Sequence, residues 1–149
     1  MTNSHDVTVL NTLIRTTLDS VKGFADACEE DEHGRHKQFF DKMSRERSQV
    51  ASELQAQVRS LGGDPEDDSS FTGAAHRGFM NLKQAVMSNS DEAIIDEVER
   101  GEDYLKAKYE AALQDGDLSA PTRQLIEQAY QSVRKGHDAA SSMKHQMEG

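Results

Sequence analysis

Apolar residues recur at three- and four-residue spacing through the first part of the chain. They are Val7, Leu10, Leu13, Ile14, Leu18, Val21, Phe24, Ala25 and Cys28. This spacing places them along one side of an amphipathic helix. Ser4 or Asp6 is expected to cap the start of that helix, because either side chain can accept a hydrogen bond from its first N–H groups. Gly34 lies just beyond its end.

The same pattern predicts three more long helices and one shorter helix. The long helices cover residues 36–61, 89–114 and 119–147, and the short helix covers residues 73–87. The period-two alternation of a strand is missing from the sequence. The fold class is therefore expected to be all-α.

Turn residues mark where these helices stop and start. Gly62 and the residues after it are typical of a helix end. Asn89 is followed three positions later by Glu92, which predicts a capping box at the start of the third long helix. Ser119 is expected to cap the last helix, with Pro121 in its first turn.

The lengths of the connections predict the topology. Each long helix has roughly 25 residues, or about 37 Å at 1.5 Å per residue. Short loops join the first helix to the second and the third long helix to the fourth, so each pair should be antiparallel. The roughly 30 residues between the pairs can cross the whole bundle, which is the ferritin-like plan. We expect one domain over residues 1–149, an up-down-down-up four-helix bundle with an extra short helix in the long crossover.

Four inward positions near the middle of the predicted bundle are not apolar. They are held by Thr17, Arg47, Glu102 and His137 on the four long helices, and Glu46 flanks Arg47. Counted from the loops, these positions lie at similar heights. We therefore expect one polar layer inside the bundle.

Two interpretations of this layer compete. In the first, it is a buried ion-pair network in which Arg47 bridges Glu46 and Glu102 near His137, which would fix helix register at some cost in stability. In the second, it is a di-metal site, which in such bundles takes a Glu from two helices and Glu-x-x-His from the other two. The mid-helix positions hold Glu46-Arg-Ser-Gln49 and Gln131-Ser-Val-Arg134 instead. Asp19, the acid on the first helix, is expected to point away from the apolar side. The metal-free network is the favoured interpretation.

Composition and charge narrow the class of protein. Lys and Arg number 17 against 27 Asp and Glu, a formal net charge of −10, which disfavours binding to nucleic acid. A single cysteine, Cys28, excludes an internal disulfide and any multi-cysteine metal site. No run approaches the roughly 18 apolar residues of a membrane span, and the first residues lack the basic region of a secretory signal. We expect an acidic, cytoplasmic protein that does not bind membranes.

Several motifs resemble those of a known family. They are Leu10-Asn-Thr-Leu-Ile14, Gly23-Phe24 with the acidic run after it, Leu61-Gly-Gly-Asp-Pro65, His76-Arg-Gly-Phe-Met-Asn-Leu-Lys83 and Glu99-Arg-Gly-Glu-Asp103. Together they resemble a bacterial four-helix-bundle family of unknown function in the ferritin-like superfamily. The resemblance implies the bundle fold. It also makes Glu46, Glu99, Glu102 and His137 the candidate metal residues, as vestiges of a ferritin-like site.

Three functional hypotheses follow. The first is an uncharacterised, stress-related, non-enzymatic bundle that has no cofactor and acts as a homodimer or through a protein partner, its metal site replaced by the ion-pair network. The alternative is a divergent di-metal carboxylate protein that handles iron or manganese or acts as an oxidase. The third is a helical adaptor whose crossover presents Phe79 and Met80 to a partner.

Overall fold

The computed structural model describes residues 2–31, 34, 36–67 and 81–148, and all regular structure in those ranges is helical. The helices are α1 (Thr2–Glu30), α2 (Lys37–Ser60), α3 (Leu82–Met87), α4 (Asp91–Leu113) and α5 (Ala120–Glu148). The predicted all-α fold is confirmed. None of the helices in these ranges is long and apolar enough to cross a bilayer.

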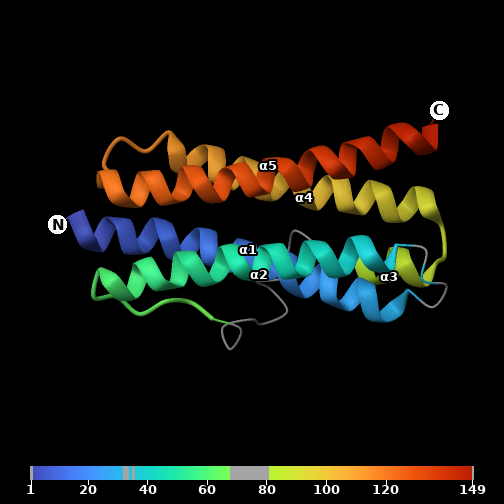
Figure 1. Cartoon of the computed structure of the whole chain (residues 1–149), viewed down its shortest axis with the longest axis horizontal. Coiled ribbons are helices and arrows are strands. Elements are labelled where there is room, and N and C mark those ends of the chain that lie inside the picture. The colour runs from blue at the N-terminus through green and yellow to red at the C-terminus, as the bar shows by residue number, and fades with distance from the viewer. Residues whose placement is uncertain (1, 32–33, 35, 68–80, 149) are drawn as a thin grey trace.

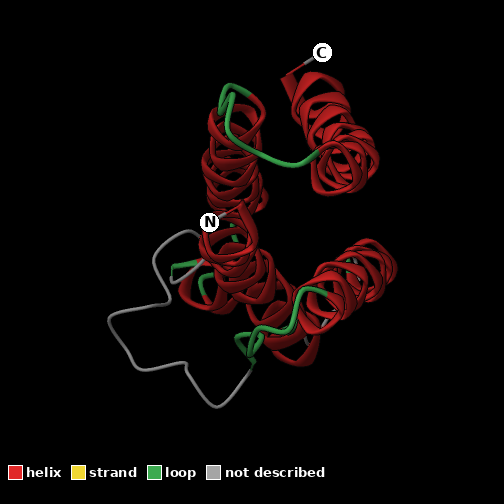
Figure 2. Cartoon of the chain, turned by 90° about the vertical axis from the view of Figure 1, so that its left-hand side faces the viewer, coloured by secondary structure: helices red, strands yellow, loops and turns green. Residues whose placement is uncertain are grey.

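The four long helices pack as two hairpins, α1 with α2 and α4 with α5 (Figure 1). In that view α1 and α5 run in one direction and α2 and α4 in the other. The hairpins meet where α1 packs on α4 and α2 packs on α5, while α3 covers α1 and α4. Seen along the bundle, the four long helices surround a common axis (Figure 2). Because α2 and α4 run in the same direction, the end of α2 and the start of α4 lie at opposite ends of the bundle, as the connection lengths predict.

The helix ends differ from the sequence predictions in two places. The first helix begins at Thr2, earlier than the capping residues suggested, and Asp6 lies within it. At the start of α4, Ser90 is the capping residue and its side chain accepts from the backbone N–H of Ala93 at 3.2 Å. Asn89, the predicted cap, has a φ of 59° and forms the turn before it.

The Asp6 carboxylate stabilises the far hairpin instead of its own helix. It is fully buried, and it accepts from the backbone N–H of Ser119 at 3.1 Å and from the Ser119 hydroxyl at 2.5 Å. Ser119 stands directly before α5, where helix N–H groups lack partners within the helix. This contact holds the start of α5 against the first turns of α1.

Gly62 ends α2 as the sequence predicts. Its φ is +82°, a conformation that suits glycine, and its N–H donates to the carbonyl of Arg59. Of the predicted short helix over residues 73–87, only residues 82–87 are described and helical. Phe79 and Met80, the residues of the adaptor hypothesis, lie outside the described residues.

The apolar core is divided into two clusters along the bundle. The first contains Leu10, Leu13, Ile14, Leu18, Val50, Ala51, Leu54, Val58, Leu105, Tyr109, Ala112, Leu118, Ile126, Ala129 and Val133. The second contains Phe24, Ala27, Phe40, Met43, Leu82, Ala85, Val86, Ile94, Val98 and Ala140. On α2, α4 and α5 the boundary falls between Met43 and Val50, between Val98 and Leu105, and between Val133 and Ala140. Two of the four predicted polar residues, Arg47 and Glu102, lie in this gap. Thr17 lies beside it, next to Leu18 of the first cluster. On α5 the buried residue in the gap is Gly136, whereas His137, the predicted one, is only half-buried.

Candidate functional site

A buried ion pair occupies the gap between the two apolar clusters. Arg47 on α2 donates from Nη1 to Oε1 of Glu102 at 2.9 Å and from Nη2 to Oε2 at 2.6 Å. The two side chains are 1% and 0% exposed. This parallel two-bond arrangement is the strong form of an Arg–carboxylate pair. It links the two hairpins, because Arg47 belongs to one and Glu102 to the other.

A glycine on α5 makes room for this ion pair. A Cβ built on Gly136 would overlap Nη2 of Arg47 and would lie 2.6 Å from Cε of Met43. Only a residue without a side chain lets the guanidinium lie this close to the α5 backbone. Gly136 is thus part of the site, although it carries no functional group.

A neutral hydrogen bond lies beside the ion pair. The hydroxyls of Thr17 on α1 and Tyr109 on α4 are 2.7 Å apart, and Thr17 also donates to the carbonyl of Leu13 at 2.7 Å. Burial raises the pKa of Tyr109 to about 12, while the Thr17 hydrogen bond and the charge of Arg47 act in the opposite direction. We call Thr17, Arg47, Glu102, Tyr109 and Gly136 the mid-bundle layer.

The mid-bundle layer confirms the expected ion pair between Arg47 and Glu102 and changes its predicted partners. Glu46 was expected to share the guanidinium, but it is only half-buried and lines a groove of about 430 Å³ between α2 and α5. The Nε of Arg47 is buried and makes no hydrogen bond with a described residue. Tyr109 was assigned to the apolar stripe, and its hydroxyl proves to be a polar member of the layer.

Asp19 contradicts the sequence prediction. It was expected to point away from the apolar side of the first helix, yet it is only 1% exposed. The middle of α1 is buried on several sides, because α2, α3 and α4 all pack on it. Helix periodicity assumes one solvent-facing side, and α1 does not have one at this height.

The four candidate metal residues form separate contacts. Glu102 binds Arg47, while Glu99 on α4 accepts from Lys144 of α5 at 3.0 Å. His137 has its Nε2 2.5 Å from Oδ1 of Asp103, a pair at the edge of the α4–α5 contact. Glu46 lies at the groove described above. Glu102, Glu99 and His137 therefore each contact a different residue, and the structure does not bring the four candidates together.

The only Glu-x-x-His spacing in the sequence is Glu30 to His33. It falls at the end of α1, far along the chain from the mid-helix positions, and His33 lies outside the described residues. In the middle of α2 and α5, where a di-metal site would need this spacing, the sequence has Glu46-Arg-Ser-Gln49 and Gln131-Ser-Val-Arg134.

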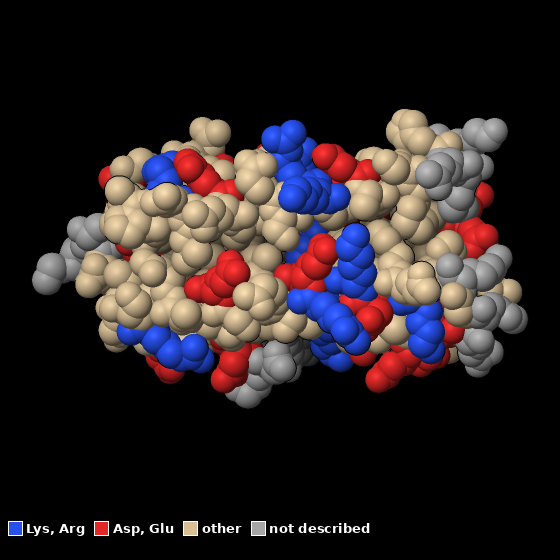
Figure 3. All heavy atoms as spheres, in the orientation of Figure 1, with Lys and Arg blue, Asp and Glu red and all other residues tan. Residues whose placement is uncertain are grey.

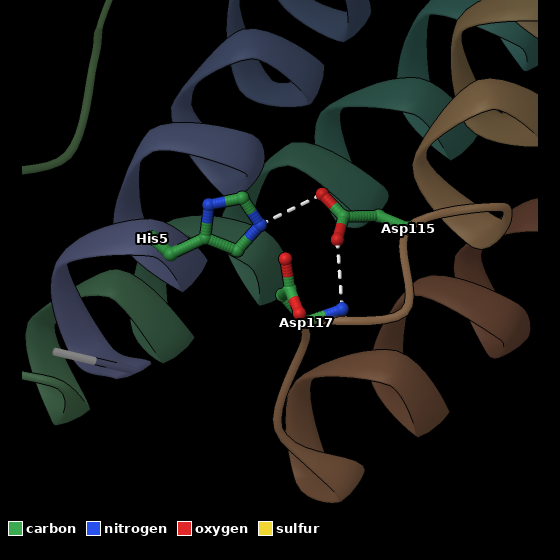
Figure 4. Close-up of side chains that lie close together, drawn as sticks. All are labelled: His5, Asp115 and Asp117. Atoms are coloured by element: carbon green, nitrogen blue, oxygen red, sulfur yellow. Dashed lines mark hydrogen bonds and ion pairs between the residues drawn. The ribbon is translucent and has the colours of Figure 1, made fainter.

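A second group of ligating side chains lies at one end of the bundle (Figure 4). His5 of α1 and Asp115 and Asp117 of the α4–α5 loop each offer one donor atom, and these atoms lie within 4.8 Å of one another. Within the described residues this is the one such group of three. Sequence reasoning missed it because His5 and Asp115 are 110 positions apart. The predicted topology was the one signal that could have revealed this group, because it places the start of α1 and the α4–α5 loop at the same end of the bundle.

Comparison with known families identifies the relatives of this bundle. Residues 6–115 match the family described as "Domain of unknown function (DUF2383)". The chain belongs to this family. The matched range contains four of the five residues of the mid-bundle layer, all except Gly136 on α5. No curated protein sequence matches the chain significantly.

Charged side chains of both signs are scattered among uncharged residues on the face shown in Figure 3. In Figure 3, Lys and Arg side chains alternate with Asp and Glu over the visible face. Several form exposed ion pairs along one helix, such as Arg100 with Glu97 at 2.7 Å. On the visible face no large patch of one sign appears among the described residues.

Proposed function

We propose that this chain is a non-enzymatic, ferritin-like bundle in which an ion pair replaces the mid-bundle metal site. Its role is structural and associative: it acts in a bacterial cytoplasm as a homodimer or through a protein partner. The main support for this proposal is the buried ion pair between Arg47 and Glu102. The ferritin-like assignment draws on the motif resemblance and on the helix directions.

The chemistry of the pair supports this proposal. A di-metal site needs carboxylates whose oxygens are free to bridge cations. Both oxygens of Glu102 accept hydrogen bonds from Arg47, so the positive charge is supplied by the protein itself. A metal ion that took the place of the guanidinium on Glu102 would leave Arg47 charged in an apolar core. Losing one partner of a buried pair costs about 3–5 kcal/mol.

The neighbouring groups support it further. Tyr109 stays a neutral phenol at physiological pH, because burial raises its pKa to about 12. A neutral phenol bonded to Thr17 is a packing group rather than a proton carrier near pH 7. The layer thus joins three of the four long helices through hydrogen bonds and touches the fourth at Gly136. Such a layer specifies one register for the two hairpins.

Metal content of the purified protein tests the proposal. The untagged protein is produced in medium with iron and manganese, and its metal is measured by elemental analysis. The apoprotein then receives Fe(II) without oxygen, and oxygen uptake is followed after air is admitted. We expect oxygen uptake no faster than that of the same Fe(II) in buffer alone, and the same metal content in wild type and in Glu102→Gln. Asp103→Asn, one position along α4, is the matched control.

Two results would overturn the proposal. One is a wild-type protein that binds iron or manganese in whole equivalents which Glu102→Gln loses and Asp103→Asn keeps. The other is oxygen consumption by the iron-loaded wild type that exceeds that of Fe(II) in buffer and is lost in Glu102→Gln, which supports the alternative of a di-metal oxidase. If Glu102→Gln fails to fold, anomalous scattering from crystals of metal-treated wild type shows directly whether an ion lies at mid-bundle.

A further inference from the structure

The end of the bundle opposite the C-terminus brings together an imidazole and two carboxylates. His5 lies in the first turns of α1, and its Nε2 is 2.7 Å from Oδ2 of Asp115. Asp117 is two residues further along the same loop, and its backbone N–H donates to Oδ1 of Asp115 at 2.9 Å. Figure 4 shows the three side chains converging on one space between α1 and the loop.

The nearby cation leaves these carboxylates available. Arg123 of α5 lies next to this loop, and its guanidinium donates to the backbone carbonyls of Leu113 and Asp115. It therefore satisfies the end of α4 and does not occupy a carboxylate oxygen of the group.

We propose that His5, Asp115 and Asp117 form a binding site for one divalent transition-metal ion. The ion replaces the His5–Asp115 hydrogen bond and is bound by the imidazole Nε2 and one oxygen from each carboxylate. Solvent completes its coordination, because the His5 side chain is 40% exposed and Asp117 is exposed as well.

The donor set defines the class of ion. Imidazole suits zinc, copper, iron and nickel, whereas magnesium and calcium prefer oxygen donors alone. Two carboxylates balance the charge of a divalent ion and, unlike thiolates, do not select copper(I). Zinc, with its tolerance of mixed nitrogen and oxygen ligands, is the natural probe.

Binding here has a structural consequence separate from the mid-bundle layer. The ion links the first turns of α1 to the α4–α5 loop, elements of different hairpins. Asp6, adjacent to His5, already connects α1 to Ser119 at the start of α5. A metal at this site therefore strengthens an existing junction between the hairpins.

Calorimetric titration of the untagged protein with ZnCl2 tests the site. We expect one zinc ion per chain, and at least a tenfold weaker affinity in His5→Ala and in Asp117→Asn. His36→Ala is the matched control, because His36 pairs with one acid, Asp91, at 3.0 Å and belongs to no group of three in the described residues. Titration with MgCl2 should give no binding.

Thermal unfolding of each variant without metal shows whether it is folded. Asp117 is exposed, so Asp117→Asn should leave the metal-free fold unchanged. Absence of zinc binding by wild type overturns the proposal, as does equal affinity in wild type and Asp117→Asn. If Asp117→Asn loses the metal and Glu102→Gln keeps it, the ion binds at the His5 site. If Glu102→Gln loses the metal and Asp117→Asn keeps it, the ion binds in the mid-bundle layer.

Discussion

Replacing Arg47 alone should destabilise the protein more than replacing Arg47 and Glu102 together. The variants are Arg47→Met, Glu102→Met and the double variant, which replace each charged side chain by an unbranched apolar one. In wild type the two side chains are 1% and 0% exposed, so neither charge is hydrated. Each single variant leaves one charge buried without its partner, whereas the double variant leaves none.

The expected magnitudes follow from this burial. Removing one partner of a buried pair costs about 3–5 kcal/mol, while replacing both by apolar residues is often neutral or stabilising by about 1–4 kcal/mol. For a chain of this size, 1 kcal/mol shifts the melting temperature by about 2–4 °C. Each single variant should therefore melt roughly 6–20 °C below wild type. The double variant also removes the Arg47 Nε, which has no hydrogen-bond partner among described residues.

Urea unfolding followed by circular dichroism at 222 nm measures the free energy of unfolding of all four proteins. Arg100→Met is the matched control, because Arg100 pairs with Glu97 at 2.7 Å while 46% exposed. Such exposed pairs contribute about 0–1 kcal/mol. The reasoning is refuted if the double variant loses as much stability as the two single losses added together. It is also refuted if Arg47→Met costs no more than Arg100→Met.

The remaining predictions concern packing, pH and the hairpin junction. Gly136→Ala should cost about 1–3 kcal/mol in urea unfolding, because its Cβ overlaps Arg47, while the unobstructed Gly116→Ala should stay within about 0.5 kcal/mol. Tyr109 has a folded pKa of about 12 against 10.0 unfolded, so the unfolded state loses its proton first. Stability is intact below pH 10 and should fall by about 1.4 kcal/mol per pH unit towards pH 12, a slope reduced in Tyr109→Phe. Asp6→Ala should cost about 1–3 kcal/mol, because the half-buried N–H and hydroxyl of Ser119 lose their acceptor. A melting temperature equal to wild type would contradict this.

Much of the fold could be predicted from the sequence, for identifiable reasons. Apolar residues at helical spacing give the long helices, and the observed bounds of α2 and α4 lie within two residues of the expected ones. The inward positions of Arg47 and Glu102 were visible because each interrupts an apolar stripe at the same height. Glycine turns such as Gly62 were visible because left-handed backbone favours that residue.

Errors arose where a residue's role depends on a distant segment. Asn89 and Ser90 both suit a helix cap, and local sequence does not decide between them. Asp6 was assigned to its own helix, yet it binds Ser119, which is 113 positions away. Asp19 was placed on a solvent side that other helices cover. The spacing of apolar residues within one helix does not show which of its polar sides another part of the chain will cover.

The sequence by itself determined the all-α class, the four long helices, their pairing and the height of the polar layer, because these depend on spacing along one chain segment. The tertiary structure decided which charges meet. It gave both oxygens of Glu102 to Arg47, placed Glu46 at a groove, and joined His5 to Asp115 and Asp117. Helix periodicity fixes which side a residue occupies. Which side chain it meets there depends on how the hairpins dock, and in this bundle that docking depends on a glycine, Gly136, that leaves room for the guanidinium.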